Sequence, residues 1–289
     1  MGYRLYVDST ADFPKELLKE FPDITVIPME IMIEDAIYCY GEDENFTFDY
    51  FYSELESGKF ADTSQINPTI YEEYFEKALM QGEDILYLCF TSGMSGTINS
   101  ARLSAMRLRE KYPERKVVCL DTLAASVGGG FLLHETAKKK AEGMELDELA
   151  EWVTDNRLKV CHWFTVDRFE HLKHGGRVSA ASATIGSALN IKPLLRVDEE
   201  GKLKVKEKPR GQKQAMNSLL DKMQSGWKKE MGQTVFIGHG HVPERAEELA
   251  DKVLQLYPDA KIHIAEIGPV IGAHTGPGML ALVYWGNNR

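Results

Sequence analysis

Short apolar stretches alternate with helical patterns in the first half of the chain. Runs rich in β-branched and aromatic residues predict strands at residues 4–8, 26–33, 85–90 and 116–121. Apolar residues recur at helical spacing over residues 71–80, 100–111, 124–141 and 146–156. This alternation is typical of βαβ units, so it predicts a mostly parallel sheet whose faces are covered by helices.

A different pattern begins near residue 160. Strand-like segments at residues 194–197 and 202–206 flank the turn-like segment Asp198-Glu199-Glu200-Gly201, which predicts a β-hairpin and therefore a partly antiparallel sheet. Further strands are expected at residues 163–167, 234–238, 261–267 and 279–285, and helices at residues 213–229 and 243–256.

We therefore predict an α/β fold with two domains. Residues 1–159 would form an N-terminal, three-layer domain with a mostly parallel sheet, and residues 160–289 a C-terminal, two-layer α/β domain with a mixed sheet. The length of 289 residues agrees with two domains of roughly 150 residues each. Since no proline- or glycine-rich linker separates the halves, we expect them to pack together with a ligand cleft between them.

Composition and charge narrow the class of protein. The chain has 34 Lys plus Arg against 44 Asp plus Glu, a net charge of −10, which disfavours binding to nucleic acid or to an anionic membrane. No apolar run approaches the ~20 residues of a membrane helix, so we expect a cytoplasmic protein without stable membrane insertion. The four cysteines are far apart and are predicted to be core thiols rather than disulfides or metal ligands: Cys39, Cys89, Cys119 and Cys161.

The densest polar cluster is the segment Thr-Ser-Gly-Met-Ser-Gly-Thr at residues 91–97, between a predicted strand and a predicted helix. A helix start offers unpaired N–H groups and partial positive charge, and glycine lets a ligand come close. Helix capping requires only one such side chain, so the whole run predicts an anion site. A phosphate or nucleotide is one candidate anion, but the chain lacks a P-loop lysine and a complete dinucleotide-binding motif.

The same loop is close to the nucleophile elbow of serine hydrolases. Gly93 and Ser95 match that motif, but Thr97 stands where its second glycine belongs. A hydrolase would also require His274 as base and an acid such as Asp121, an order along the chain that is permitted. An esterase-like serine hydrolase using Ser95 and His274 is thus the alternative function.

Three other segments supply hydrogen-bonding groups. Thr63-Ser64-Gln65 precedes a predicted helix, where hydroxyls also serve as caps. Gly175-Gly176-Arg177 is a tight turn whose guanidinium is suited to binding a carboxylate or to holding a loop. The segment Gly-Ala-His-Thr-Gly-Pro-Gly at residues 272–278 predicts a constrained turn that brings His274 to the entrance of the last strand.

Two further patterns have ordinary explanations. His239 and His241 have no third ligand nearby, so no metal site is predicted. A series of alternating lysines would share one face of a strand, which is typical of a solvent-exposed hairpin; a docking surface for an acidic partner is the alternative. These lysines are Lys202, Lys204, Lys206 and Lys208.

Taken together, these motifs resemble the DegV family over nearly the whole chain. Each motif is weak alone, but their order along the chain is specific. The matching segments are residues 8–12, 63–65, 92–97, 121–122, 128–130, 175–179, 191–195 and 271–278.

The resemblance implies a protein that binds one long-chain fatty acid, with the carboxylate at the domain interface and the acyl chain in an apolar tunnel. In bacteria such proteins can be the binding subunit of a fatty-acid kinase and present the carboxylate to a separate ATP-dependent kinase, whose acyl phosphate enters phospholipid synthesis. The resemblance implies neither a catalytic residue nor a cofactor in this chain. The residues expected to bind the carboxylate are Thr63, Ser64, Ser95, Gly96, Arg177 and His274.

Overall fold

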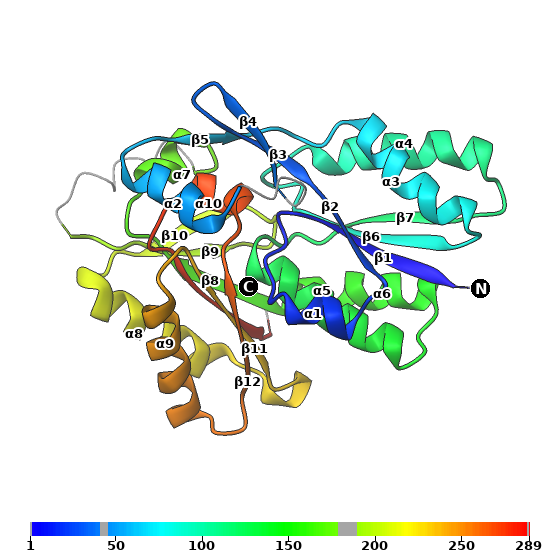
Figure 1. Ribbon diagram of the computed structural model, residues 1–289. Coiled ribbons are helices and arrows are strands. Elements are labelled where there is room, and N and C mark those ends of the chain that lie inside the picture. Colours follow the sequence, from blue (N-terminus) through cyan, green and yellow to red (C-terminus); the bar gives the residue numbers. More distant parts are fainter. Residues whose placement is uncertain (1, 41–45, 179–189, 288) are drawn as a thin grey trace.

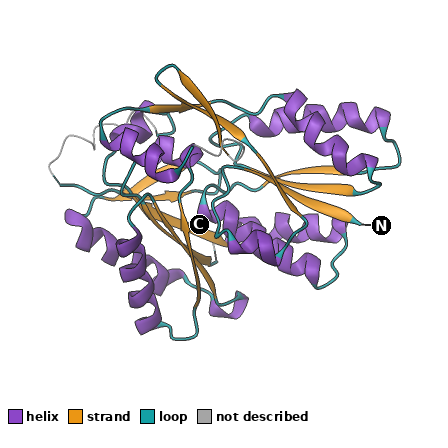
Figure 2. Cartoon of the chain, viewed as in Figure 1, coloured by secondary structure: helices purple, strands orange, loops and turns teal. Residues whose placement is uncertain are grey.

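Two large β-sheets organise the chain, with helices on their outer faces and between them (Figures 1 and 2). The structure is a computed structural model that describes residues 2–40, 46–178, 190–287 and 289. Ser179, the last residue of the segment at 175–179, lies outside the described residues. The predicted α/β fold class, with one parallel and one mixed sheet, is confirmed.

The first large sheet is parallel and has the order β2-β1-β6-β7. Leu5 of β1 and Leu86 of β6 pack on the side of the core that α5 and α6 cover, whereas Tyr6 and Tyr87 pack on the opposite side, against α3 and α4. The elements are β1 (Tyr3–Asp8), α1 (Glu16–Glu20), β2 (Ile24–Ile27), α3 (Pro68–Met80), β6 (Asp84–Cys89), α4 (Thr97–Lys111), β7 (Val117–Asp121), α5 (Val127–Ala141) and α6 (Leu146–Asn156).

A small antiparallel sheet corrects the prediction of one strand over residues 26–33. The chain leaves the parallel sheet after Ile27 and enters a second sheet at Met29, with Pro28 between them. Proline has no N–H to give to a ladder of hydrogen bonds, so it interrupts the strand although the apolar pattern continues. This sheet has the order β4-β3-β5, and its elements are β3 (Met29–Ile33), β4 (Ala36–Tyr40), α2 (Phe48–Glu56), which follows β4, and β5 (Ala61–Thr63).

The second large sheet is mixed, with the order β10-β9-β8-β13-β11-β12. Its β9–β10 hairpin is antiparallel, as predicted, and only the pair β11–β12 is parallel among the strand pairs described for this sheet. Helices α8 and α9 cover one face. The elements are β8 (Val160–Thr165), α7 (Glu170–His174), β9 (Leu194–Val197), β10 (Leu203–Glu207), α8 (Gly211–Gly226), β11 (Thr234–His239), α9 (Pro243–Leu256), β12 (Lys261–Glu266), α10 (Pro269–Thr275) and β13 (Leu280–Trp285), with 3₁₀ turns at Arg157–Lys159 and Lys229–Met231.

Helix α5 connects the two large sheets. Its Phe131 makes edge-to-face ring contacts with Phe236 of β11 and Trp285 of β13, and it belongs to the same buried cluster as Leu5 of β1. Residues on both sides of position 159 therefore share one hydrophobic core. The domain boundary at residue 159 stays a prediction.

Other expectations are settled by local structure. Residues 269–275 form helix α10 rather than the turn predicted from residue 272 onward, and the turn is confined to Gly276–Gly278, where both glycines have positive φ. All four cysteines are thiols; Cys89 and Cys161 are buried, while Cys39 and Cys119 are half-buried. No helix in the described parts of the chain is long and apolar enough to cross a membrane.

Candidate functional site

A cavity lies beyond the carboxyl ends of the parallel strands, where the parallel sheet meets the mixed sheet. Thr10 follows β1, Phe90 follows β6, and residues 125–128 form the start of α5. The opposite wall comes from β8 and β13. The empty volume is about 820 Å³, which includes open space at the mouth. The cavity thus lies at the carboxyl-end edge of the parallel sheet, where a ligand was predicted to bind.

One wall of the cavity follows β13. Met279, which precedes that strand, and Ala281 and Val283 within it all line the cavity, as expected for alternate residues on one face. Four residue steps of an extended chain correspond to about 13 Å. Phe164 and His162 on β8 are the register partners of Ala281 and Val283, so β8 extends the same wall. The lining along this direction is mostly apolar.

Thr63 and His274 meet at one end of the cavity. Thr63 is the last residue of β5, His274 lies in the last turn of α10, and the Oγ1–Nε2 distance is 2.9 Å. His274 Nδ1 is buried and has no hydrogen-bond partner among the described residues. Burial, and secondarily the charge of Arg177, lowers the pKa of His274 to about 4. The imidazole is therefore neutral at pH 7.

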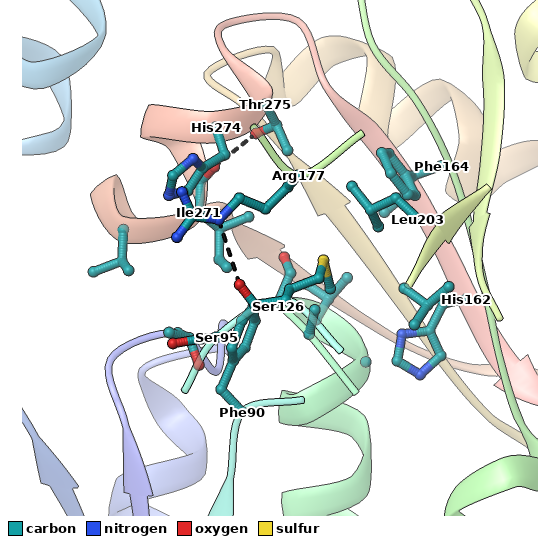
Figure 3. Close-up of a pocket in the computed structure, with 18 of the residues that line it drawn as sticks. Phe90, Ser95, Ser126, His162, Phe164, Arg177, Leu203, Ile271, His274 and Thr275 are labelled. Carbon is teal, nitrogen blue, oxygen red and sulfur yellow. Dashed lines mark hydrogen bonds between the residues drawn. The ribbon is translucent and has the colours of Figure 1, made fainter. Parts of the chain in front are cut away.

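Arg177 lies beside His274 (Figure 3). Its guanidinium donates to the carbonyl oxygen of Gly175 at 2.5 Å and to that of Met94 at 3.4 Å. Gly175 permits the arrangement, because a Cβ there would lie 2.1 Å from His274 Nδ1. The guanidinium is thus attached to the loop that carries Ser95 and is held against the imidazole.

Ser95 reaches the same end from the loop before α4. Its Oγ lies 2.9 Å from Thr97 Oγ1 and accepts a hydrogen bond from the Thr97 N–H at 3.3 Å. Gly96 is the N-cap of this 15-residue helix and supplies no side-chain cap. The first turn of α4 therefore presents partial positive charge beside Ser95.

Ser64 and Gly96 have different positions from the other predicted residues. Ser64 is exposed at the rim of the cavity, and its Oγ donates to Glu30 Oε2 at 3.2 Å. Gly96 faces the Gln65 amide, which a Cβ at this position would approach to 3.2 Å. The structure thus brings Thr63, Ser95, Arg177 and His274 to one end of the cavity, a group we call the polar cluster.

The arrangement of a serine hydrolase does not form in the described residues. His274 Nε2 is bonded to Thr63, Ser95 Oγ to Thr97, and no carboxylate contacts His274 Nδ1. Asp121, the candidate acid, accepts hydrogen bonds from the backbone N–H groups of Ser92 and Leu123. Both the nucleophile–base contact and the base–acid contact of a triad are missing.

Asp12 and His162 lie at the site although no role was predicted for them from the sequence. Asp12 is buried and accepts hydrogen bonds from Ser126 Oγ and from the Gly268 N–H, both at 2.7 Å. It thereby ties together the residues that precede α5 and α10, two helices that line the cavity. Burial raises the pKa of Asp12 to about 7. The glycine run at 128–130 was the available signal for His162, because a Cβ on Gly128 would lie 1.8 Å from the His162 ring.

The histidine pair and the lysine series lie outside the polar cluster. His241 Nδ1 is 2.9 Å from Glu266 Oε1, and no cluster of metal-binding side chains is found in the described part of the chain. The four lysines are exposed, and the hairpin that bears them touches the Ser95 loop, where Thr91 Oγ1 donates to the Gly201 carbonyl at 3.0 Å. Two of the lysines pair within the hairpin, Lys202 with Glu200 and Lys204 with Asp198.

The fold and the site define a class: an α/β protein with a mostly apolar cavity that has hydrogen-bonding side chains at one end. Comparison with known proteins is consistent with this class. A family model described as "Uncharacterised protein, DegV family" matches residues 3–287. The chain belongs to the DegV family.

Individual relatives cover nearly the whole chain. A DegV domain-containing protein of Clostridium perfringens is 40% identical over 285 residues, which are 99% of this chain and 98% of the relative. A fatty-acid-binding DegV family protein from Thermus thermophilus superposes with a TM-score of 0.86 at 28% identity, covering 99% of this chain and 100% of its own. The Streptococcus pneumoniae fatty acid kinase B3 protein, loaded with linoleic acid, has the same fold, with a TM-score of 0.87 at 21% identity over 99% of this chain and 100% of its own.

Proposed function

We propose that this protein binds one long-chain fatty acid, with the carboxylate at the polar cluster and the acyl chain along β13. The observation that carries the proposal is the separation within one cavity: Thr63, Ser95, Arg177 and His274 gather at one end, and apolar side chains line the wall beyond them. Similar solved structures include fatty-acid-binding proteins, such as the one from Thermus thermophilus, which supports the proposal.

The polar cluster suits a carboxylate in particular. Burying a carboxylate without hydrogen bonds is very costly, whereas hydroxyl and guanidinium donors form the stronger, charge-assisted bonds with it. Thr63 and Ser95 supply hydroxyls, Arg177 supplies the positive charge, and α4 directs its N-terminus to the same place. The net charge of −10 is therefore no obstacle, because local donors decide the binding.

Presentation to a separate kinase is the second part of the proposal. The polar cluster lies near the surface, since the neighbouring Ser64 and Gln65 are exposed, whereas Ala281 and Val283 are 3% and 1% exposed. A bound fatty acid would thus keep its acyl chain enclosed and its carboxylate accessible to a second protein. The DegV resemblance supplies the reaction: an ATP-dependent kinase would phosphorylate this carboxylate to acyl phosphate.

Lipid extraction tests the binding. Purified protein is analysed by native mass spectrometry, then denatured and extracted, and we expect a long-chain fatty acid at about one per chain. Thr63→Val and Ser95→Ala should each reduce the bound fraction. Ser92→Ala is the matched control, because Ser92 is exposed in the same loop and does not line the cavity. Absence of lipid in both the purified and the lipid-soaked protein would refute the proposal.

Acyl-phosphate formation tests the presentation. The fatty-acid-loaded protein is mixed with ATP and the catalytic subunit of a bacterial fatty-acid kinase, and acyl phosphate is trapped as the hydroxamate. We expect product only when the loaded protein is present. If several such kinases give no product while the fatty acid stays bound, presentation to a kinase is wrong and fatty-acid binding stands.

A further inference from the structure

We propose that the inner end of the cavity binds an oxygen substituent on the acyl chain, through His162, so that the preferred ligands include hydroxy or oxo fatty acids. The inference rests on the proposed fatty-acid binding and deepens it by naming a ligand class. It starts from the position of His162 on β8, across the cavity from the polar cluster (Figure 3).

His162 is a polar side chain without a partner in an apolar environment. It is 4% exposed, and its Nε2 has no hydrogen-bond partner in the described structure. A buried polar group without a hydrogen-bond partner destabilises the folded protein. Its neighbours along the cavity wall are Phe164, Leu203 and Val283. An apolar side chain of similar size would fill this position equally well.

The other polar side chains that line the interior already have partners. Thr275 Oγ1 donates to the Ile271 carbonyl at 3.1 Å, and Ser126 Oγ donates to Asp12 Oδ2 at 2.7 Å. Thr10 Oγ1 donates to Asp8. Away from the polar cluster, His162 is thus the described lining side chain whose hydrogen-bonding capacity remains unused.

The surroundings hold the His162 ring in place and keep it neutral. Gly128 leaves room for the ring, since a Cβ there would lie 1.8 Å from Cε1 and 2.5 Å from Nε2. Burial, and secondarily the charge of Arg289, lowers the pKa of His162 well below its usual value. Arg289 is itself buried, and its guanidinium donates to the Val160 carbonyl at 2.9 Å. A neutral imidazole has one donor and one acceptor, so it pairs with a hydroxyl or a carbonyl but attracts no second carboxylate.

The position of His162 restricts where the oxygen can lie on the chain. Its register partner is Val283, about 13 Å along β13 from Met279. An oxygen next to the carboxylate would stay in the polar cluster, whereas one in the distal part of the chain would reach the imidazole. The ligand class is therefore a fatty acid with a hydroxyl or oxo group far from the carboxylate.

The test compares octadecanoic acid with a series of monohydroxy-octadecanoic acids whose hydroxyl is moved stepwise toward the terminal carbon. Dissociation constants are measured by calorimetry on delipidated full-length protein. We expect one or two distal isomers to bind about 2- to 10-fold more tightly than octadecanoic acid, the contribution of one neutral hydrogen bond. His162→Phe should reverse this preference, and His162→Gln should retain part of it. His263→Phe, a histidine outside the cavity lining, should leave the ratio as in the wild type.

Each outcome decides a different statement. If the wild type binds octadecanoic acid but no hydroxylated isomer more tightly, or if His162→Phe leaves the preference unchanged, the role of His162 is wrong and fatty-acid binding stands. If neither ligand binds to the wild type, the proposed function and this inference both fail. Should His162→Phe not fold, as judged by its melting curve, His162→Gln together with the wild-type series decides the question.

Discussion

The two ends of the cavity each contain a histidine, half-buried in the case of His274 and buried in the case of His162, but they are built differently. His274 has Thr63 at 2.9 Å and the guanidinium of Arg177 beside it, near exposed residues. His162 lies among apolar side chains, with no partner for Nε2 in the described structure. Burial lowers the pKa of both rings. His274 thus belongs to a group of hydrogen-bonding side chains that suits a charged ligand group. His162 has no such neighbours, so its end of the cavity suits a neutral group.

Each imidazole ring occupies space that is free only because a neighbouring residue is glycine. A Cβ on Gly175 would lie 2.1 Å from His274 Nδ1, and one on Gly128 would lie 1.8 Å from His162 Cε1. The glycines of these two motifs therefore have a steric explanation in the packing of histidines from other elements.

The largest effect is expected at the charged end. Arg177→Met should weaken fatty-acid binding about 10- to 100-fold, because a hydrogen bond to a charged group contributes about 1.5–3 kcal/mol. Calorimetric titration with octadecanoic acid measures this. Arg107→Met is the matched control, since Arg107 lies on α4 and pairs with Glu72 at the surface. An Arg177→Met protein that binds as tightly as the control would show that the guanidinium only holds the loop.

The next largest effect is on the pH dependence of the free energy of unfolding, to which His274 and Asp12 contribute with opposite signs. The pKa of His274 is lowered from 6.5 to about 4, so the folded state binds fewer protons than the unfolded state between these values and stability rises with pH. The pKa of Asp12 is raised from 3.8 to about 7, so between these values stability falls as pH rises. The two contributions oppose each other from about pH 4 to pH 6.5.

Asp12→Asn should remove the opposing contribution of Asp12, so that the effect of His274 on the pH dependence of stability can be measured. The amide still accepts from the Gly268 N–H and lets the Ser126 hydroxyl act as acceptor. Urea unfolding at pH 4 to 6.5 should show stability increasing with pH more steeply than in the wild type, by about 2–3 kcal/mol over the range. His274→Gln should make the free energy of unfolding increase less steeply with pH than in the wild type. Equal slopes in the wild type and Asp12→Asn would contradict the assigned titration.

A smaller effect, on the stability of the protein, is expected for a substitution of Gly128, which packs against the His162 ring. Gly128→Ala should destabilise the protein by about 1–3 kcal/mol through overpacking. Gly129→Ala, one residue along α5, would meet only Ala11 at 3.5 Å and should be neutral or stabilising by up to about 1 kcal/mol. In a His162→Ala background, Gly128→Ala should lose most of its cost. Thermal melts of the wild type, the three single variants and the double variant form the test, and an equal cost of both alanines would exclude the ring contact as the cause.

Much of the fold was predictable because periodicity is a local property. Helix α9 has the predicted bounds, Pro243–Leu256, because a proline at its first position and a regular apolar face mark it in the sequence. Helix α10 escaped prediction because it is buried almost all round, so its sequence shows no polar face. Pro28 marked the break between β2 and β3, but the apolar run on both sides concealed it.

The candidate site was predictable only in part, for a related reason. Thr63, Ser95, Arg177 and His274 lie in local motifs whose order resembles a known family, although their convergence depends on the fold. His162 and Asp12 interact with residues far along the chain, such as Gly128 and Gly268, and no local pattern marks such contacts. Their roles follow from burial and distances, which a single sequence does not contain.

The smallest effect on binding is expected at the lysine hairpin. Lys206 and Lys208 are exposed, so Lys206→Glu/Lys208→Glu should change the affinity for octadecanoic acid by less than about twofold, because surface charges contribute little. Lys204 is left intact because it pairs with the buried carboxylate of Asp198, which holds the hairpin turn against Thr91. If the hairpin is a docking surface, acyl-phosphate formation by the kinase should fall while calorimetry shows unchanged fatty-acid binding. Unchanged product formation would leave the lysines as a solvated face, and a large loss of affinity would mean that the hairpin turn transmits strain to the Ser95 loop.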